Sequence, residues 1–123
     1  MSVTQVYHVI EKRELLGIAA MSKSDGWRLV QISVTAKETY DLLYSFEKDY
    51  DMVHLRVELI PGEWIESVSS IFPYAFLYEN EMQDLFGIDV RGMNLDFHGE
   101  LYQTKVKAPL HIKTVDEGDI QNG

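Results

Sequence analysis

Alternating apolar and polar side chains mark three successive segments of this chain, at residues 27–35, 39–47 and 52–60. Such alternation is typical of strands that bury one face. Short loops separate the segments, so we expect three consecutive strands in an antiparallel meander. A shorter apolar-rich segment at residues 5–10 predicts one more strand ahead of them.

A modest helix is predicted between the first strand and the meander. Residues 11–21 place apolar side chains at helical spacing, namely Leu15, Ile18, Ala19 and Met21. Gly17 lies within this segment and lowers its helix propensity by about 1 kcal/mol relative to alanine. The turn residues Ser24, Asp25 and Gly26 follow the helix and lead into the meander.

A stronger helical pattern lies between Pro73 and Gly87. Proline suits the first turn of a helix, because its missing N–H needs no partner there. Glycine ends a helix by adopting the left-handed conformation. Apolar positions between these residues form one stripe that would cover a core: Ala75, Tyr78, Met82, Leu85 and Phe86.

The element order predicts an α+β two-layer sandwich, in which two helices cover one face of a mostly antiparallel sheet. Residues 64–70 would be a connector whose Trp64 and Ile65 tuck against the sheet. No sustained period follows Asp89, so we expect an extended C-terminal arm with one short strand at residues 110–113. We set the domain at residues 1–92 and a partly disordered arm at residues 93–123. Polar side chains mark the uncovered sheet face, which would be solvated or bind a partner: Gln31, Ser33, His54, Arg56 and Glu58.

The composition excludes several kinds of chemistry. A chain of 123 residues with 46% hydrophobic residues fits one compact domain. It contains no cysteine, so it has no disulfide, no thiolate ligand for zinc or an iron–sulfur cluster, and no thiol nucleophile. The histidines are dispersed without metal-ligand spacing: His8, His54, His98 and His111. We therefore expect no metal and no cofactor in this chain.

The charge is acidic and unevenly distributed. Asp and Glu number 20 against 11 Lys and Arg, for a net charge of −9, which disfavours binding to nucleic acid and anionic lipid. Residues 61–100 contain 8 acids and a single base, Arg91. These acids either form a solvated surface or steer a basic partner surface. No signal pattern and no stretch of ~20 apolar residues occurs, so we expect a cytoplasmic protein without direct membrane insertion.

Residues 79–88 read E-N-E-M-Q-D-L-F-G-I. This segment resembles the signature of the complex I 30 kDa subunit family, found in NADH-quinone oxidoreductase, which runs E-R-E-x-x-D-x-F-G followed by I or V. Residues 68–73, V-S-S-I-F-P, resemble the lead-in to that signature, and the likeness extends back to about Gln5. After Gly92 the chain departs from the family, because residues 93–95 are M-N-L where histidine and proline are expected, and the arginine-rich stretch is missing.

Those departures are similar to the short homologue in energy-converting, membrane-bound nickel–iron hydrogenases of the Ech or carbon-monoxide-linked type. The resemblance implies a non-catalytic structural subunit of an oxidoreductase complex, contributing to electron transfer only by positioning its partners. The implied partners are the hydrogenase large and small (iron–sulfur) subunits or their complex I-like homologues. It also implies a peripheral position on the inner face of the cell membrane, reached through those subunits.

The helical periodicity places Glu81, Asp84 and Ile88 on one face, where Ile88 would be an exposed apolar contact rimmed by two acids. Together with the resemblance, this predicts a partner interface formed by Glu79, Glu81, Asp84, Gly87, Ile88, Arg91 and Met93. Three other interpretations remain open: the acids form helix caps and salt bridges, they serve as acid/base groups of a small enzyme, or the domain is an oligomeric ligand-binding module. No catalytic residue is expected under the first interpretation or the interface one.

Overall fold

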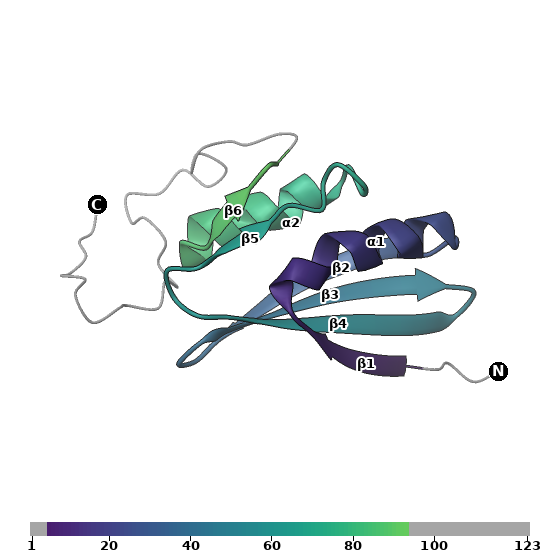
Figure 1. The fold of residues 1–123 in the computed structure, drawn as a ribbon, viewed down its shortest axis with the longest axis horizontal. Coiled ribbons are helices and arrows are strands. Elements are labelled where there is room, and N and C mark those ends of the chain that lie inside the picture. Colours follow the sequence, from purple (N-terminus) through teal and green to yellow (C-terminus); the bar gives the residue numbers. More distant parts are fainter. Residues whose placement is uncertain (1–4, 94–123) are drawn as a thin grey trace.

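The computed structural model describes residues 5–93, which fold around a mixed four-stranded sheet (Figure 1). The strands lie in the order β1-β4-β3-β2. Three of them pair in sequence as the predicted antiparallel meander, and β1 pairs in parallel with β4 at the edge. Their bounds are β1 Gln5–Ile10, β2 Arg28–Ala36, β3 Tyr40–Lys48 and β4 Asp51–Leu59.

Two helices cover one face of this sheet (Figure 1). The first is α1, Leu15–Ser24, preceded by the short 3-10 helix η1, Lys12–Glu14. The second is α2, Ala75–Glu81, which continues as the π-helix η2, Met82–Phe86. Gly87 then ends the helix in the left-handed conformation, at φ 70°. The predicted α+β fold, with helices on one side of a largely antiparallel sheet, is confirmed.

The core lies between the sheet and the helices. Alternate residues of β3 point into it and are almost completely buried: Tyr40, Leu42, Tyr44 and Phe46. From the predicted helical stripe, Ala75 and Met82 are buried, whereas Tyr78, Leu85 and Phe86 are half-buried. The hydroxyls of Tyr40 and Tyr78 donate hydrogen bonds to the carbonyls of Phe86 and Val30, each at 2.9 Å. These bonds fasten the second helix across the sheet.

A second, two-stranded sheet replaces part of the predicted connector and arm. Strand β5, Trp64–Glu66, pairs in parallel with β6, Asp89–Arg91. Ile65 is buried as predicted, but Trp64 is 40% exposed, so the prediction that it tucks against the main sheet is wrong. Both strands have three residues, too few to produce a recognisable alternation. The predicted strand at residues 110–113 and nearly all of the predicted arm lie outside the described residues.

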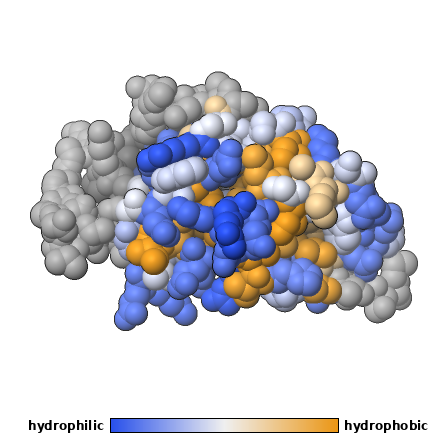
Figure 2. All heavy atoms as spheres, in the orientation of Figure 1, coloured by the Kyte–Doolittle hydropathy of each residue, from blue (hydrophilic) through white to orange (hydrophobic). Residues whose placement is uncertain are grey.

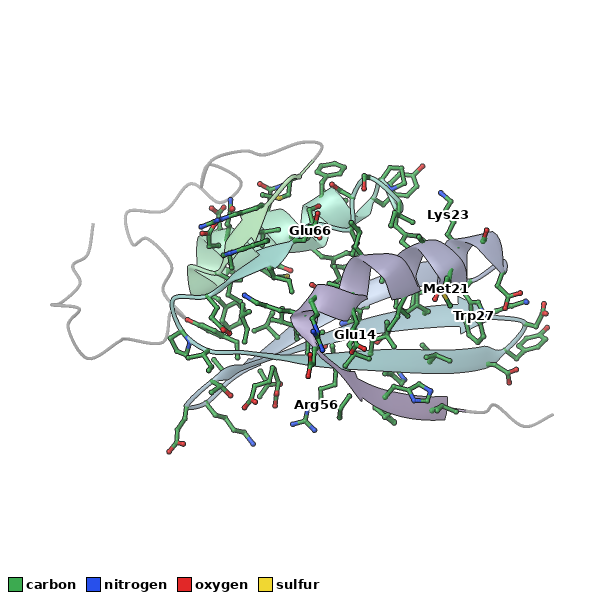
Figure 3. The ribbon with its side chains drawn as sticks, viewed as in Figure 1. Glu14, Met21, Lys23, Trp27, Arg56 and Glu66 are labelled. Carbon is green, nitrogen blue, oxygen red and sulfur yellow. The ribbon has the colours of Figure 1, made fainter. Side chains whose placement is uncertain are left out.

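No helix of residues 5–93 covers the other face of the main sheet, and Figure 3 shows Arg56 projecting from it. His54 is nevertheless 7% exposed, because the ring of Tyr7 stacks on it with 4.4 Å between centroids. Its Nε2 lies 3.0 Å from the Gln5 side-chain oxygen and its Nδ1 lies 2.7 Å from the Ser45 hydroxyl. Since an amide oxygen only accepts, Nε2 carries the proton and Ser45 donates to Nδ1. These contacts attach β1 to the sheet edge.

Candidate interaction site on α2 and β6

The signature segment lies along α2, η2 and β6. In a π-helix the backbone bonds reach one residue further than in an α-helix, so the turn is wider. This widening over Met82–Phe86 changes the direction in which the following side chains point. The Gly87 N–H donates to the Gln83 carbonyl at 3.0 Å, and the Ile88 N–H reaches the Met82 carbonyl at 3.4 Å. The chain then reverses into β6 beside β5.

Glu79 is completely buried and connects α2 to the segment that follows β5. One carboxylate oxygen accepts a hydrogen bond from the Ser67 hydroxyl at 2.6 Å, and the other accepts one from the Val68 N–H at 2.8 Å. The Ser67 hydroxyl also accepts from the Ser69 N–H at 2.9 Å. The Ser67 N–H donates to the Arg91 carbonyl at 2.8 Å. The buried acid therefore links α2 to the segment after β5, and the backbone of that segment is bonded in turn to β6.

Burial governs the ionisation of this acid. It raises the pKa of Glu79 to about 7, although the hydrogen bonds from Ser67 and Val68 favour the charged form and oppose the shift. Burial, and secondarily the charge of Glu79, raises the pKa of Tyr44 above its ordinary value. Within residues 5–93, the buried Tyr44 hydroxyl has no hydrogen-bond partner. The interior therefore contains a buried carboxyl group and a buried hydroxyl group that has no hydrogen-bond partner among these residues.

The predicted exposed contact around Ile88 is wrong. Ile88 is 2% exposed and Asp84 is 6% exposed. The prediction assumed a regular α-helix with solvent beyond its acidic face. The π turn changes the phase of the helix after Met82, and the β5–β6 pair brings further apolar residues to the same region, with Val90 at 4% exposed. Ile88 joins the apolar core cluster with Val90.

The remaining members of the predicted interface lie at the surface. Gly87 and Arg91 are exposed, and Glu81 and Met93 are half-buried. Arg91 pairs with Asp89 at 3.0 Å, and its guanidinium lies 4.8 Å from the centroid of the Trp64 ring. The ammonium of Lys12 lies 5.1 Å from that centroid and donates to the Trp64 carbonyl at 3.0 Å.

Trp64, Lys12 and Arg91 thus form a surface of one aromatic ring and two cations. Arg91 was predicted, but the other two residues were not. The parallel pairing that brings β5 beside β6 leaves no local signal in the sequence. Tryptophan and arginine are both enriched at protein interfaces.

The acid/base interpretation requires two carboxylates that converge on a pocket. Glu81 lines a pocket of about 270 Å³ together with Gln31 and Tyr78, but Asp84 does not line it. Across residues 5–93, no group of three or more histidines and acids is arranged to hold a metal ion. No helix in that part of the chain is long and apolar enough to span a membrane.

A family model described as the 30 Kd subunit of respiratory-chain NADH dehydrogenase matches residues 4–111. No curated protein matches the sequence. Among solved structures, a chain from the membrane-bound sulfane sulfur reductase, an archaeal respiratory membrane complex, superposes with a TM-score of 0.76. The two chains are 14% identical, and the match covers 88% of this chain and 68% of the other. At that identity the likeness shows a common fold.

Proposed function

The chain belongs to the 30 kDa subunit family of respiratory-chain NADH dehydrogenase, and we propose that it is a non-catalytic structural subunit of a membrane-associated, energy-converting nickel–iron hydrogenase or a related complex. The observation that carries the proposal is the position of Glu79 and Asp84. Two of the three acids of the family signature are buried in the fold, and Glu79 joins α2 to the segment after β5 through hydrogen bonds. Glu79 and Asp84 therefore have a structural role in the fold and not a catalytic one.

The proposed partners are the hydrogenase large and small subunits or their complex I-like homologues. Through them the chain would lie on the cytoplasmic face of the membrane without entering it. The structural neighbour belongs to a respiratory membrane complex, which supports this kind of setting. No cofactor is assigned to this chain.

We propose that the interface has two layers of residues. The residues that reach the surface contact the partner directly: Glu81, Gly87, Arg91 and Met93. Glu79, Asp84 and Ile88 act from inside by fixing the path of the chain between η2 and β6. Trp64 lies beside Arg91 and extends the contact surface.

Reversing the charge of Arg91 tests this proposal. Arg91→Glu alters an exposed side chain, so the melting temperature of the isolated chain should change little. It should weaken assembly at least tenfold, because a cation stacked on an interfacial tryptophan is a strong contact. The matched control is Lys37→Glu in the β2–β3 turn, which is equally exposed and should assemble normally.

The measurement is co-purification with the hydrogenase large and small subunits from cells that make the complex. Wild-type protein that recovers neither subunit would rule out the subunit function. If Arg91→Glu assembles as well as Lys37→Glu, the subunit function stands and the interface lies on another face.

A further inference from the structure

A pocket of about 320 Å³ lies where the end of α1, the start of β2 and the start of α2 meet. Its volume falls in the range of specific binding sites. Figure 3 shows Lys23, Met21 and Trp27 at this end of α1. Aromatic side chains and two cations form most of its wall: Lys23, Trp27, Arg28, Phe72, Tyr74 and Tyr78.

The surface beside the pocket is unusually apolar for an exposed region. Tyr74 is 79% exposed, and Leu77, one turn further along α2, is 49% exposed. On α1, no residue from Leu15 to Ser22 is charged, and Met21 is 69% exposed. Figure 2 shows hydrophobic surface over this helix. Exposed apolar area of this kind beside a pocket is typical of a protein contact.

The charge available at the pocket is positive. Arg28 is paired with Glu47. Lys23 donates to the Ile71 carbonyl at 2.8 Å and lies 5.6 Å from the centroid of the Phe72 ring. Among the described residues no carboxylate pairs with Lys23, and no acid lines the pocket. In a chain with a net charge of −9, Lys23 leaves the wall of this pocket locally positive.

We propose that this pocket docks a segment of a partner subunit that carries a large apolar side chain and, within one helical turn of it, a carboxylate. The apolar side chain fills the space between Trp27 and Phe72, and the carboxylate pairs with Lys23 at the rim. The inference rests on the proposed subunit function. It places a second contact at the start of α2, whereas Gly87 and Arg91 lie beyond the end of η2.

Charge disfavours a second copy of this chain as the occupant. In a two-fold contact the same patch meets itself, so Lys23 would face Lys23 with no acid from the pocket wall between them. Like charges placed opposite one another at an interface are penalised. A partner that brings its own carboxylate avoids this repulsion.

Direct coupling of Lys23 to its partner tests the proposal. A water-soluble carbodiimide joins an amine to a carboxylate in contact with it and adds no spacer. Applied to the purified complex, it should link Lys23 to an Asp or Glu of another subunit, next to a large apolar residue. Acetylation of Lys23 should be at least tenfold slower in the complex than in the isolated chain, whereas acetylation of Lys37 should be unchanged.

Two variants of Lys23 provide the functional readout. Lys23→Glu should lower co-purification of the partner subunits at least tenfold, and Lys23→Arg should restore it because the positive charge is kept. Lys23 is exposed, so both variants should melt close to the wild type.

Three other results would contradict either this inference or the proposed function. A link from Lys23 to a second copy, or to residues 94–123 of the same chain, identifies a different occupant. If the wild type assembles while Lys23 reacts as fast in the complex as in the isolated chain, this inference fails and the proposed function stands. If the wild type recovers no partner, the proposed function fails.

Discussion

The two helices of this domain distribute polar and apolar residues in opposite ways. Helix α1 has a long uncharged segment, yet only Leu15 and Ala19 are buried, and Met21 is largely exposed. Helices α2 and η2 are rich in polar residues, yet they bury Glu79 and Asp84 together with Asn80. The lack of charge on α1 would suggest that it is the more buried of the two helices.

The difference shows that hydrogen-bonding partners decide which polar residues can be inside. Glu79 can be buried because a hydroxyl and a backbone N–H bind its two oxygens, which offsets part of the loss of water. The apolar outer side of α1 has no such local explanation. It is the kind of surface that a second protein would cover. Three experiments test this contrast.

Removing the Glu79 carboxylate should have the largest effect. Glu79→Ala leaves the Val68 N–H without its acceptor, which costs about 1–3 kcal/mol, whereas the Ser67 hydroxyl can donate to the Ser69 hydroxyl 2.7 Å away. Truncating the buried side chain also leaves a cavity, which costs about 2–5 kcal/mol. The free energy of unfolding at pH 7, measured by urea denaturation, should therefore fall by roughly 3–8 kcal/mol. Glu66→Ala is the control, since Glu66 is an exposed acid on β5 (Figure 3). If Glu79→Ala lowers the free energy of unfolding no more than Glu66→Ala does, Glu79 is not a structural link.

Stability should also depend on pH through Glu79. Its folded-state pKa is raised to about 7, whereas glutamate in an unfolded chain titrates at about 4.3. Between these values the folded chain binds more protons, so the free energy of unfolding falls as pH rises. The contribution is complete below about pH 4 and is lost through pH 7, a change of about 4 kcal/mol. The difference between wild type and Glu79→Gln, measured by urea denaturation at pH 5 and pH 8, should contain most of this change. Parallel profiles for the two proteins would contradict the raised pKa.

The smallest effect is expected on the outside of α1. Met21→Ser replaces an exposed apolar side chain, so the free energy of unfolding of the isolated chain should change by no more than about 0.5 kcal/mol. Thermal unfolding measures this change. The matched change Leu15→Ala, in the core on the same helix, should cost about 2–5 kcal/mol. A loss at Met21 comparable to that at Leu15 would show that α1 is packed on both sides, and the contrast between the helices would disappear.

The sequence predicted the main sheet well because long alternating segments carry a strong signal. The predicted bounds of the second, third and fourth strands differ from the structure by one residue at each end. The helix end at Gly87 was also predicted, because the left-handed conformation needs a glycine there. These features are local, so their causes are visible in adjacent residues.

The candidate site was predicted less well because its causes are distant. Strands β5 and β6 are too short to recognise and pair across the whole second helix. The π turn has no residue signature, yet it changes which side chains face outward. The burial of Glu79 depends on Ser67 and Val68, which precede it by 12 and 11 residues and lie outside its helix. The sequence therefore predicted the helix that carries the candidate site but placed Asp84 and Ile88 at the surface, whereas the structure buries both.

The parallel pairing of β1 with β4 has a consequence for how the protein is made. Gln5 lies opposite Met52, and Ile10 lies opposite Val57. On a ribosome that adds about 5–20 residues per second, the first strand leaves the exit tunnel several seconds before its partner exists. During that interval the backbone N–H and C=O groups of β1 have no β4 to pair with. We expect the meander to form first, because its contacts are local, and the earliest part of the chain to be the last to join the sheet.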